Sequence, residues 1–204
     1  MKIIKPSANI VAASALLEQT IERAGRVCYK SEEKITDTSH TQFIEHIKGL
    51  HHDSVLEHGS ITVHIVCDRG VSHELVRHRI ASFSQESTRY CNYGKDKFDN
   101  EITVIETPFW TKESVGYAIW KDVMHQAETS YLSLLEGGAT PQEARSVLPN
   151  SLKTEIVITA NPREWRHIFR MRTASSAHPQ MQEIMKPLLA QFKEQWPGIF
   201  GDLL

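Results

Sequence analysis

The order of secondary-structure signals along the chain restricts its fold to a mixture of helices and short strands. Residues 60–68 (SITVHIVCD) alternate well enough for a strand, and residues 154–161 (TEIVITAN) have the β-branched composition of a second one. Other, longer segments place apolar side chains at helical spacing. Helices outnumber strands in this pattern, which is typical of an α+β protein.

The boundaries of these elements follow from residues that begin or end helices. Ser7 is a good N-cap for a helix over 8–30, Pro162 suits the first turn of another, and Gly137 and Gly138 end a third. The expected helices cover residues 8–30, 38–50, 70–79, 112–136, 141–149, 162–172 and 179–196, a further short strand covers 2–5, and residues 92–108 form a loop.

Length and charge limit the classes of function. A chain of 204 residues holds one domain or at most two, and we expect a single domain over 1–204. The net charge of −2, from 23 basic and 25 acidic residues, does not direct the protein as a whole toward nucleic acid or an acidic membrane. Any basic site is therefore local.

The cysteines and the N-terminal residues favour a cytoplasmic location. Cys28, Cys67 and Cys91 are widely spaced and form no CxxC pair, which argues against a disulfide framework or a thiolate metal site. The opening residues lack the apolar core of a signal peptide, and no run of 18 apolar residues occurs. We expect a soluble cytoplasmic protein.

Residues 77–90 (RHRIASFSQESTRY) form the first cluster of residue types that suit a ligand-binding or catalytic site. Arginine carries five donors in a rigid fork that suits phosphate oxygens and planar carbonyl edges, and the following hydroxyls and amides suit a sugar or base. If 71–79 is helical, Arg77 and Arg79 point about 160° apart and address two ligands, or two parts of a large one. A solvated helix end followed by a polar strand is the alternative.

Residues 161–172 (NPREWRHIFRMR) form the second cluster. On a helix, offsets of three, four and seven place Arg163, Arg166, His167 and Arg170 on one face. Arg172 falls on the opposite, apolar side, where a charge requires a partner. Either a carboxylate of the chain or a ligand supplies that partner, and we favour the ligand.

Two further hypotheses come from other classes of protein. Residues 51–58 (HHDSVLEH) contain His52, Asp53 and His58, as a metal-dependent phosphohydrolase would, but adjacent side chains diverge and a metal needs several converging ligands. A nucleic-acid-binding module would use the arginine-rich segments on phosphates, which the net charge disfavours.

Taken together, these segments resemble the flavin-dependent thymidylate synthases. The signature of that family is RHR, seven residues and then Ser, and here Arg77 begins it and Ser87 closes it. HHDSVLEH before the signature, and EARSVLP, TANPREWRHIFRMR and His178-Pro179 after it, appear in the family's order. The likeness spans residues 50–185.

The resemblance implies an enzyme that converts dUMP to dTMP, with methylenetetrahydrofolate as carbon donor, NADPH as reductant and FAD as the source of the hydride. It implies a single domain with a small, mostly antiparallel central sheet flanked by long helices. It also implies a homotetramer with active sites shared between subunits. From charge, composition and ligand spacing, we expect no metal, nucleic acid or membrane as partner.

The resemblance also assigns residues to each ligand. Those that match FAD contacts are Ser54, Arg77, His78, Arg79, Gln85, Asn161, Pro162, Arg163 and His167, and His52 matches a residue at the flavin edge in some members. Those that match dUMP contacts are Glu74, Leu75, Val76, Arg77, Gln85, Glu86, Ser87, Thr88, Arg89, Arg145 and Arg172.

Arg172 has the catalytic role in this assignment. The matching arginine of the family faces the uracil ring, where a guanidinium in an apolar setting stabilises the negative charge that develops as N3–H ionises. The chain departs from the common pattern at two positions: Glu74 replaces a frequent glutamine, and Gln85 stands where a glutamate can sit.

Overall fold

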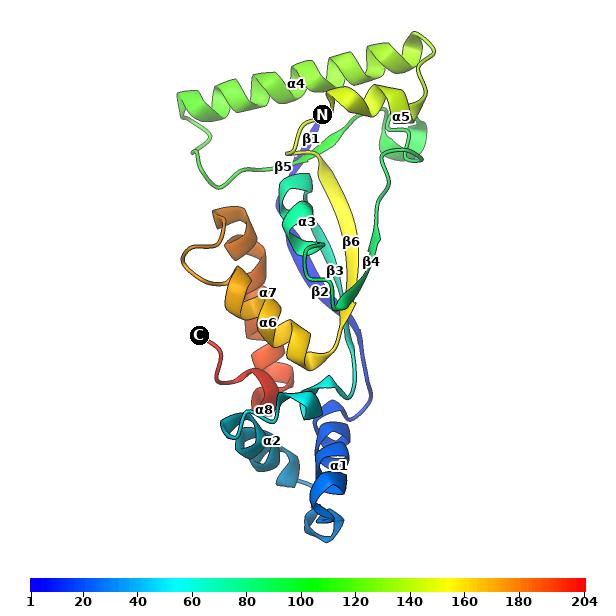
Figure 1. Ribbon diagram of the computed structural model, residues 1–204. Coiled ribbons are helices and arrows are strands. Elements are labelled where there is room, and N and C mark those ends of the chain that lie inside the picture. Colours follow the sequence, from blue (N-terminus) through cyan, green and yellow to red (C-terminus); the bar gives the residue numbers. More distant parts are fainter. The chain divides into compact units, whose positions relative to one another are not determined.

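The computed structural model describes all 204 residues and confirms an α+β fold with eight α-helices and two sheets (Figure 1). The larger sheet has the strand order β2-β3-β6-β4. These strands are β2 (Ser7–Ala13), β3 (Ile61–Asp68), β6 (Lys153–Ala160) and β4 (Ala81–Gln85). None of the helices combines the length and the apolar character that crossing a bilayer requires.

Strands β3 and β6 run antiparallel, as expected. The side chains of Thr62 and Thr159 are joined by a 2.9 Å hydrogen bond, and the backbone N–H of Arg69 donates to the carbonyl of Asn150 over 2.9 Å. The partner's number falls as the number on β3 rises, which defines an antiparallel pair. Buried side chains alternate along both strands, so one face of each packs into a core.

The helix expected from residue 8 is wrong in its first part. Residues 7–13 form β2, and helix α1 (Leu17–Tyr29) begins only after Leu16. Leu16 has a φ of 48°, in the left-handed region, which separates the strand from the helix. Burial in β2 alternates over its first residues, as in a strand. Helical periodicity starts at Leu17, which is buried together with Ile21 and Gly25 of the same face. Apolar residues in β2 made the two periods hard to distinguish by sequence.

The chain forms two compact units. Unit 1 comprises residues 1–7, 65–77 and 84–156, and unit 2 comprises residues 8–64, 78–83 and 157–204. A single domain over the whole chain stays a prediction.

Unit 1 is built around the long helix α4 (Val115–Glu136), which lies beside α5 (Pro141–Ala144) (Figure 1). Strand β1 (Lys2–Ile4) pairs in parallel with β5 (Thr103–Ile105), a strand that we had expected to be loop. The unit also contains α3 (Arg69–Leu75). Its core holds Tyr93, Ile102, Val104, Tyr117, Trp120, Met124, Tyr131, Ala144 and Leu152.

Unit 2 groups the remaining helices. They are α1, α2 (Ser39–Gly49), α6 (Pro162–Arg172), α7 (Pro179–Gln195) and α8 (Pro197–Phe200), with the short 3-10 helix η2 (Asp53–Glu57) (Figure 1). Phe192 of α7 contacts the rings of Trp165, Phe169 and Phe200 at centroid distances of 4.9–5.1 Å. This aromatic core fixes the inner face of α6, from which the Trp165 indole N–H also donates to the Ile61 carbonyl.

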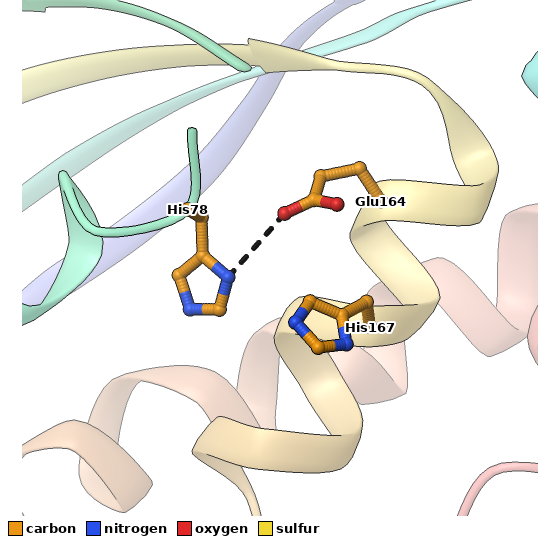
Figure 2. Close-up of side chains that lie close together, drawn as sticks. All are labelled: His78, Glu164 and His167. Atoms are coloured by element: carbon orange, nitrogen blue, oxygen red, sulfur yellow. Dashed lines mark ion pairs between the residues drawn. The ribbon is translucent and has the colours of Figure 1, made fainter. Parts of the chain in front are cut away.

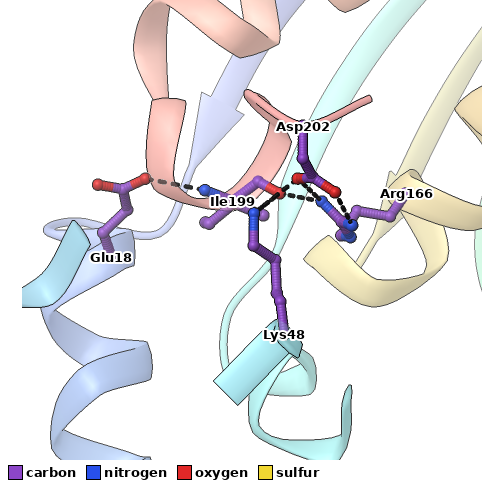
Figure 3. A network of polar contacts seen from close by, with 5 residues as sticks. All are labelled: Glu18, Lys48, Arg166, Ile199 and Asp202. Carbon is purple, nitrogen blue, oxygen red and sulfur yellow. Dashed lines mark hydrogen bonds and ion pairs between the residues drawn. The ribbon is translucent and has the colours of Figure 1, made fainter. Parts of the chain in front are cut away.

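A polar network ties the last residues of the chain to three helices of unit 2, and we call its charged centre of Lys48, Arg166 and Asp202 the Asp202 clamp (Figure 3). The buried Arg166 guanidinium donates to both carboxylate oxygens of Asp202, over 2.7 and 2.6 Å. Lys48 Nζ donates to the same carboxylate over 2.6 Å, and both cations also donate to the carbonyl of Ile199. On the other side, the N–H of Ile199 donates to Glu18.

Candidate functional site

Helix α6 presents a polar face to a pocket of about 410 Å³ in unit 2. The face begins where the Asn161 side chain caps the helix by accepting the N–H of Glu164 over 2.8 Å, and Pro162 occupies the first helical position. The side chains that were expected to share this face do so: Arg163, Arg166, His167 and Arg170 all line the pocket. The opposite wall includes Asp53, Leu56 and Glu57 of η2.

The cations on this face differ in what they already contact. Arg166 belongs to the Asp202 clamp and is only 4% exposed, so its role is structural. Burial disfavours the charged form of Asp202, but hydrogen bonds from Arg166 and Lys48 outweigh it and hold the pKa of this carboxyl below its usual range. Arg163 pairs with Glu57 over 2.5 Å at the exposed rim.

Arg172, at the end of the same helix, forms a hydrogen bond with a histidine of the signature. Its Nε donates to Nε2 of His78 over 3.0 Å. On the other side of the ring, Nδ1 of His78 lies 3.4 Å from a carboxylate oxygen of Glu164, and the ring of His167 contacts that of His78 edge-on at 5.5 Å (Figure 2). We call Glu164, His78, His167 and Arg172 the His78 cluster.

His78 is neutral in this cluster. Burial, and then the nearby charges of Arg172 and His167, lower its pKa from 6.5 to about 4. Because a guanidinium only donates, Nε2 of His78 accepts from Arg172, and the ring proton therefore resides on Nδ1, facing Glu164. The contact with Glu164 is thus one between an N–H dipole and a carboxyl group.

Glu164 is itself held in a setting that favours its protonated form. Only 8% of the residue is exposed, and this burial raises the pKa of its carboxyl, against the opposing effect of His167 and Arg163. Sequence reasoning missed Glu164. The available signal was its position three residues before His167, which places both on one helix face.

The chemistry of the His78 cluster does not suit a metal ion. The ligating atoms of His78, Glu164 and His167 lie within 4.8 Å of one another. A divalent cation would, however, have to displace the Nδ1 proton of His78 while the Arg172 guanidinium holds the other nitrogen of the ring. His52, Asp53 and His58, the residues of the metal hypothesis, do not form such a group, and His52 Nδ1 lies 2.9 Å from the Tyr29 hydroxyl.

In unit 1, Gln85 is bound to the framework of the sheet. Its side-chain amide donates to the hydroxyl of Ser72 over 2.9 Å and to that of Thr154 over 3.2 Å. The Ser72 hydroxyl already donates to the carbonyl of Arg69 over 3.0 Å, so it accepts from Gln85, and a glutamate at this position would have no proton to donate to it. Thr154 lies far from the signature in sequence and Ser72 lies just before it, and no spacing rule pointed to either as a partner of Gln85.

The residues after Gln85 form a second polar group in unit 1. Glu86 accepts from Lys153 Nζ and from the Tyr93 hydroxyl, each over 2.9 Å. Arg145 donates to the buried hydroxyl of Thr88 over 3.4 Å. The structure thus brings together Thr88 and Arg145, which the sequence had assigned to one ligand.

Ser87 and Arg89 complete this turn. The Ser87 hydroxyl accepts the N–H of Arg89 over 3.3 Å, and the exposed Arg89 side chain lies over the ring of Tyr90 at 5.5 Å. The hydroxyl of Ser87 therefore supports the turn.

The segment around the start of the signature departs from the expected helix. Helix α3 ends at Leu75, so Arg77 and Arg79 are not helical, and the angle derived for them does not apply. Both arginines are exposed on either side of the buried His78.

Other residues assigned by resemblance lie in varied settings. Leu75 is in a core with 1% exposure, so its side chain does not face a ligand, whereas Val76 is exposed and Glu74 half-buried. Ser54 is exposed on η2.

Comparison with known proteins identifies the family. The family model described as "Thymidylate synthase complementing protein" matches residues 9–198. A flavin-dependent thymidylate synthase of Geobacter sulfurreducens is 34% identical over 192 residues, which cover 91% of this chain and 81% of the relative. The chain belongs to the flavin-dependent thymidylate synthase family.

A second relative and a solved structure agree with this membership. The flavin-dependent thymidylate synthase of Pyrococcus furiosus is 31% identical over 184 residues, covering 87% of this chain and 75% of the relative. The crystal structure of a UMP/dUMP methylase, PolB from Streptomyces cacaoi bound with 5-Br dUMP, has the same fold. Its TM-score is 0.82 at 22% identity, over 98% of this chain and 96% of that one.

Membership confirms that the chain is an enzyme, and it implies a flavin cofactor, FAD. The residues of the α6 pocket fit part of such a cofactor. Its volume of about 410 Å³ lies in the usual range of small-molecule sites, about 300–1,000 Å³. Exposed guanidinium groups of Arg163 and Arg170 and the imidazole of His167 offer donors there for phosphate or ring oxygens.

Proposed function

We propose that this flavin-dependent thymidylate synthase family member methylates dUMP to dTMP, taking the carbon from methylenetetrahydrofolate and the reducing equivalents from NADPH. Relatives that carry the name of this activity match most of the chain, and the similar PolB structure is that of a UMP/dUMP methylase. The observation that carries the proposal is the hydrogen bond from Arg172 to a neutral His78, which orients a guanidinium next to the signature.

Arg172 has the central task in the proposed reaction. When bound, FAD supplies the hydride that the uracil ring receives. The guanidinium of Arg172 stabilises the negative charge that forms as N3–H of the ring ionises, and its half-buried setting strengthens that interaction. The bond through Nε to His78 fixes the plane of the guanidinium before the ligand arrives, so no reorganisation is needed then.

Unit 1 supplies the remaining proposed contacts to the nucleotide. Arg145, Arg89 and Arg77 offer charged forks to the phosphate, and the hydroxyl of Thr88 lies beside Arg145. Gln85 and Glu86 act through the turn that they anchor, because their side chains already bond Ser72, Thr154, Tyr93 and Lys153. Leu75 acts through its position at the end of α3.

Unit 2 supplies most of the proposed contacts to FAD. Arg163, His167, Arg79 and Ser54 are exposed and offer side-chain donors. Asn161 and Pro162 contribute by fixing the start of α6. His78 is only 4% exposed, so we propose that it serves FAD and dUMP through Arg172 and His167.

A homotetramer is part of the proposal, as is a cytoplasmic location. An exposed apolar stripe on α4 supports association with other copies: Val115 is 76% exposed, Ile119 61% and Val123 48%, at intervals of four residues. Ile119→Glu should convert the tetramer to smaller species in analytical ultracentrifugation. An unchanged sedimentation coefficient would remove α4 from the interface.

The function is tested on the purified protein with three ligands. We expect a yellow protein whose flavin absorbance bleaches with NADPH, faster when dUMP is present, and which forms dTMP once methylenetetrahydrofolate is added. Arg79→Ala should weaken flavin retention without changing the fold. A colourless protein that cannot be reconstituted with FAD would refute the proposal.

A further inference from the structure

Glu164 stands out among the acids of the α6 pocket because it faces the ring of His78. Its carboxylate oxygen lies 3.4 Å from Nδ1 of His78, and only 8% of the residue is exposed (Figure 2). Glu57 of the same pocket pairs with Arg163 at the exposed rim instead. Burying an acid costs free energy, so a buried carboxyl that faces an imidazole needs a physical reason for its presence.

We propose that Glu164 is a positioning residue, whose carboxyl holds His78 in the Nδ1–H tautomer and thereby keeps Nε2 as the acceptor that orients Arg172. Which nitrogen of a histidine carries the proton is set by the partner of the other nitrogen. Here a carboxyl faces Nδ1 and a pure donor faces Nε2, so both neighbours select one tautomer. The inference rests on the proposed function, because it concerns how Arg172 is aimed.

A purely structural role is the main alternative. Glu164 lies in the first turn of α6, where a negative charge interacts favourably with the helix N-terminus. The Asn161 side chain already caps this turn, however, and the Glu164 carboxyl is directed to His78, which comes from a different segment of unit 2 (Figure 2). A structural role predicts lower stability and an unchanged histidine tautomer, so the two accounts are separable.

The first experiment reads the tautomer directly. Side-chain ¹⁵N NMR of the histidine-labelled protein should show His78 as the Nδ1–H form in the wild type. Glu164→Met keeps the length of the side chain but removes the acceptor, and we expect the Nε2–H form to become populated. Glu164→Gln retains an acceptor oxygen and should retain the Nδ1–H form.

The second experiment reads dTMP formation. By analogy with the loss of a carboxylate that orients a metal-bound histidine, we expect Glu164→Met to lower kcat about 10–100-fold, with little change in the KM for dUMP or in bound flavin. Glu164→Gln should restore most of the activity. In a His78→Ala background, Glu164→Met should have no further effect, because its route to Arg172 is already cut.

A matched control isolates the effect of losing a buried carboxyl. Glu22 of α1 is 1% exposed and bonds Arg26 and Ser39, away from the His78 cluster. Glu22→Met should lower the melting temperature but leave the His78 resonances and kcat unchanged. If Glu164→Met fails to fold, Glu164→Ala serves in its place.

Two results overturn the inference. One is an unchanged His78 tautomer in Glu164→Met, and the other is a loss of activity that adds fully to that of His78→Ala. Neither would disturb the proposed function as long as the wild type makes dTMP. If the wild type makes none, the proposed function fails, while the NMR result still decides whether Glu164 sets the tautomer.

Discussion

The Asp202 clamp and the His78 cluster are built on the same helix, and each holds an arginine of α6 in a different way. Arg166 is buried and donates to both oxygens of Asp202, so a carboxylate compensates its charge (Figure 3). Arg172 donates through Nε to the neutral ring of His78. That bond orients the guanidinium through a neutral acceptor, whereas the acceptor of Arg166 is a carboxylate.

This difference indicates how a guanidinium's role can be recognised from its contacts. A bidentate pair with a carboxylate occupies the two terminal nitrogens of the guanidinium, which would otherwise bind a ligand, and it stabilises the fold. A bond from Nε to an imidazole acts at the base of the fork and sets its direction.

Breaking the clamp should cost the most stability. Asp202→Ala leaves the Arg166 guanidinium buried without its carboxylate, and we expect the free energy of unfolding to fall by about 3–5 kcal/mol. Urea denaturation of the loaded enzyme measures it. Adding Arg166→Met, which removes the buried charge, should recover part of the loss. If Asp202→Ala alone costs less than about 1 kcal/mol, the clamp is not what holds the last residues of the chain.

Removing Arg172 should affect catalysis and spare stability. We expect Arg172→Ala to lower kcat for dTMP formation about 10²–10³-fold, as loss of one preorganised donor does, while FAD stays bound. Arg172→Lys keeps the charge but loses the fork and the bond to His78, so it should recover only a small part. Steady-state kinetics and the flavin spectrum provide the measurements. Normal turnover of Arg172→Ala would disprove the activating role.

His78 should make stability depend on pH in a defined window. Since its pKa falls from 6.5 in the unfolded chain to about 4 in the folded one, the unfolded state binds more protons between these values. The free energy of unfolding should therefore decrease as the pH drops from 6.5 to 4, by about 3 kcal/mol at most, and be insensitive to His78 above this window.

The titration of neighbouring groups also changes how stability depends on pH, so the contribution of His78 is measured as the difference between the wild type and a His78 variant. The raised pKa of Glu164 has the opposite sign, because the folded state then takes up the proton first. Urea unfolding between pH 4 and 7 should give a shallower slope for His78→Gln than for the wild type. Parallel curves would mean that His78 is not buried in its neutral form.

Arg163 should have the smallest effect on stability. Its pair with Glu57 is exposed, with 53% and 44% of the two side chains accessible, and such pairs contribute about 0–1 kcal/mol. Arg163→Ala should leave the melting temperature nearly unchanged but weaken flavin retention on gel filtration. A large drop in melting temperature would place Arg163 with the clamp, and unaltered flavin retention would remove it from the proposed FAD contacts.

Much of the fold followed from the sequence because periodicity records local geometry. The strands at β3 and β6, the stop of α4 at Gly137 and the common face of Arg163 and His167 on α6 all agree with the structure. The signature and the segments around it were sufficient to predict the family that the comparisons confirm. These features depend only on residues close together in the chain.

The partners of the charged side chains were decided by the tertiary structure alone. Arg166 donates to Asp202, Arg172 donates to His78, which lies 94 residues earlier in the chain, and Gln85 donates to Thr154. No spacing rule relates the members of these pairs. Helical periodicity places Arg166 and Arg163 on one face, yet packing of the last residues of the chain buries one of them. The sequence does not show whether an arginine contacts a carboxylate, an imidazole or a ligand, because the contacting group belongs to another secondary-structure element.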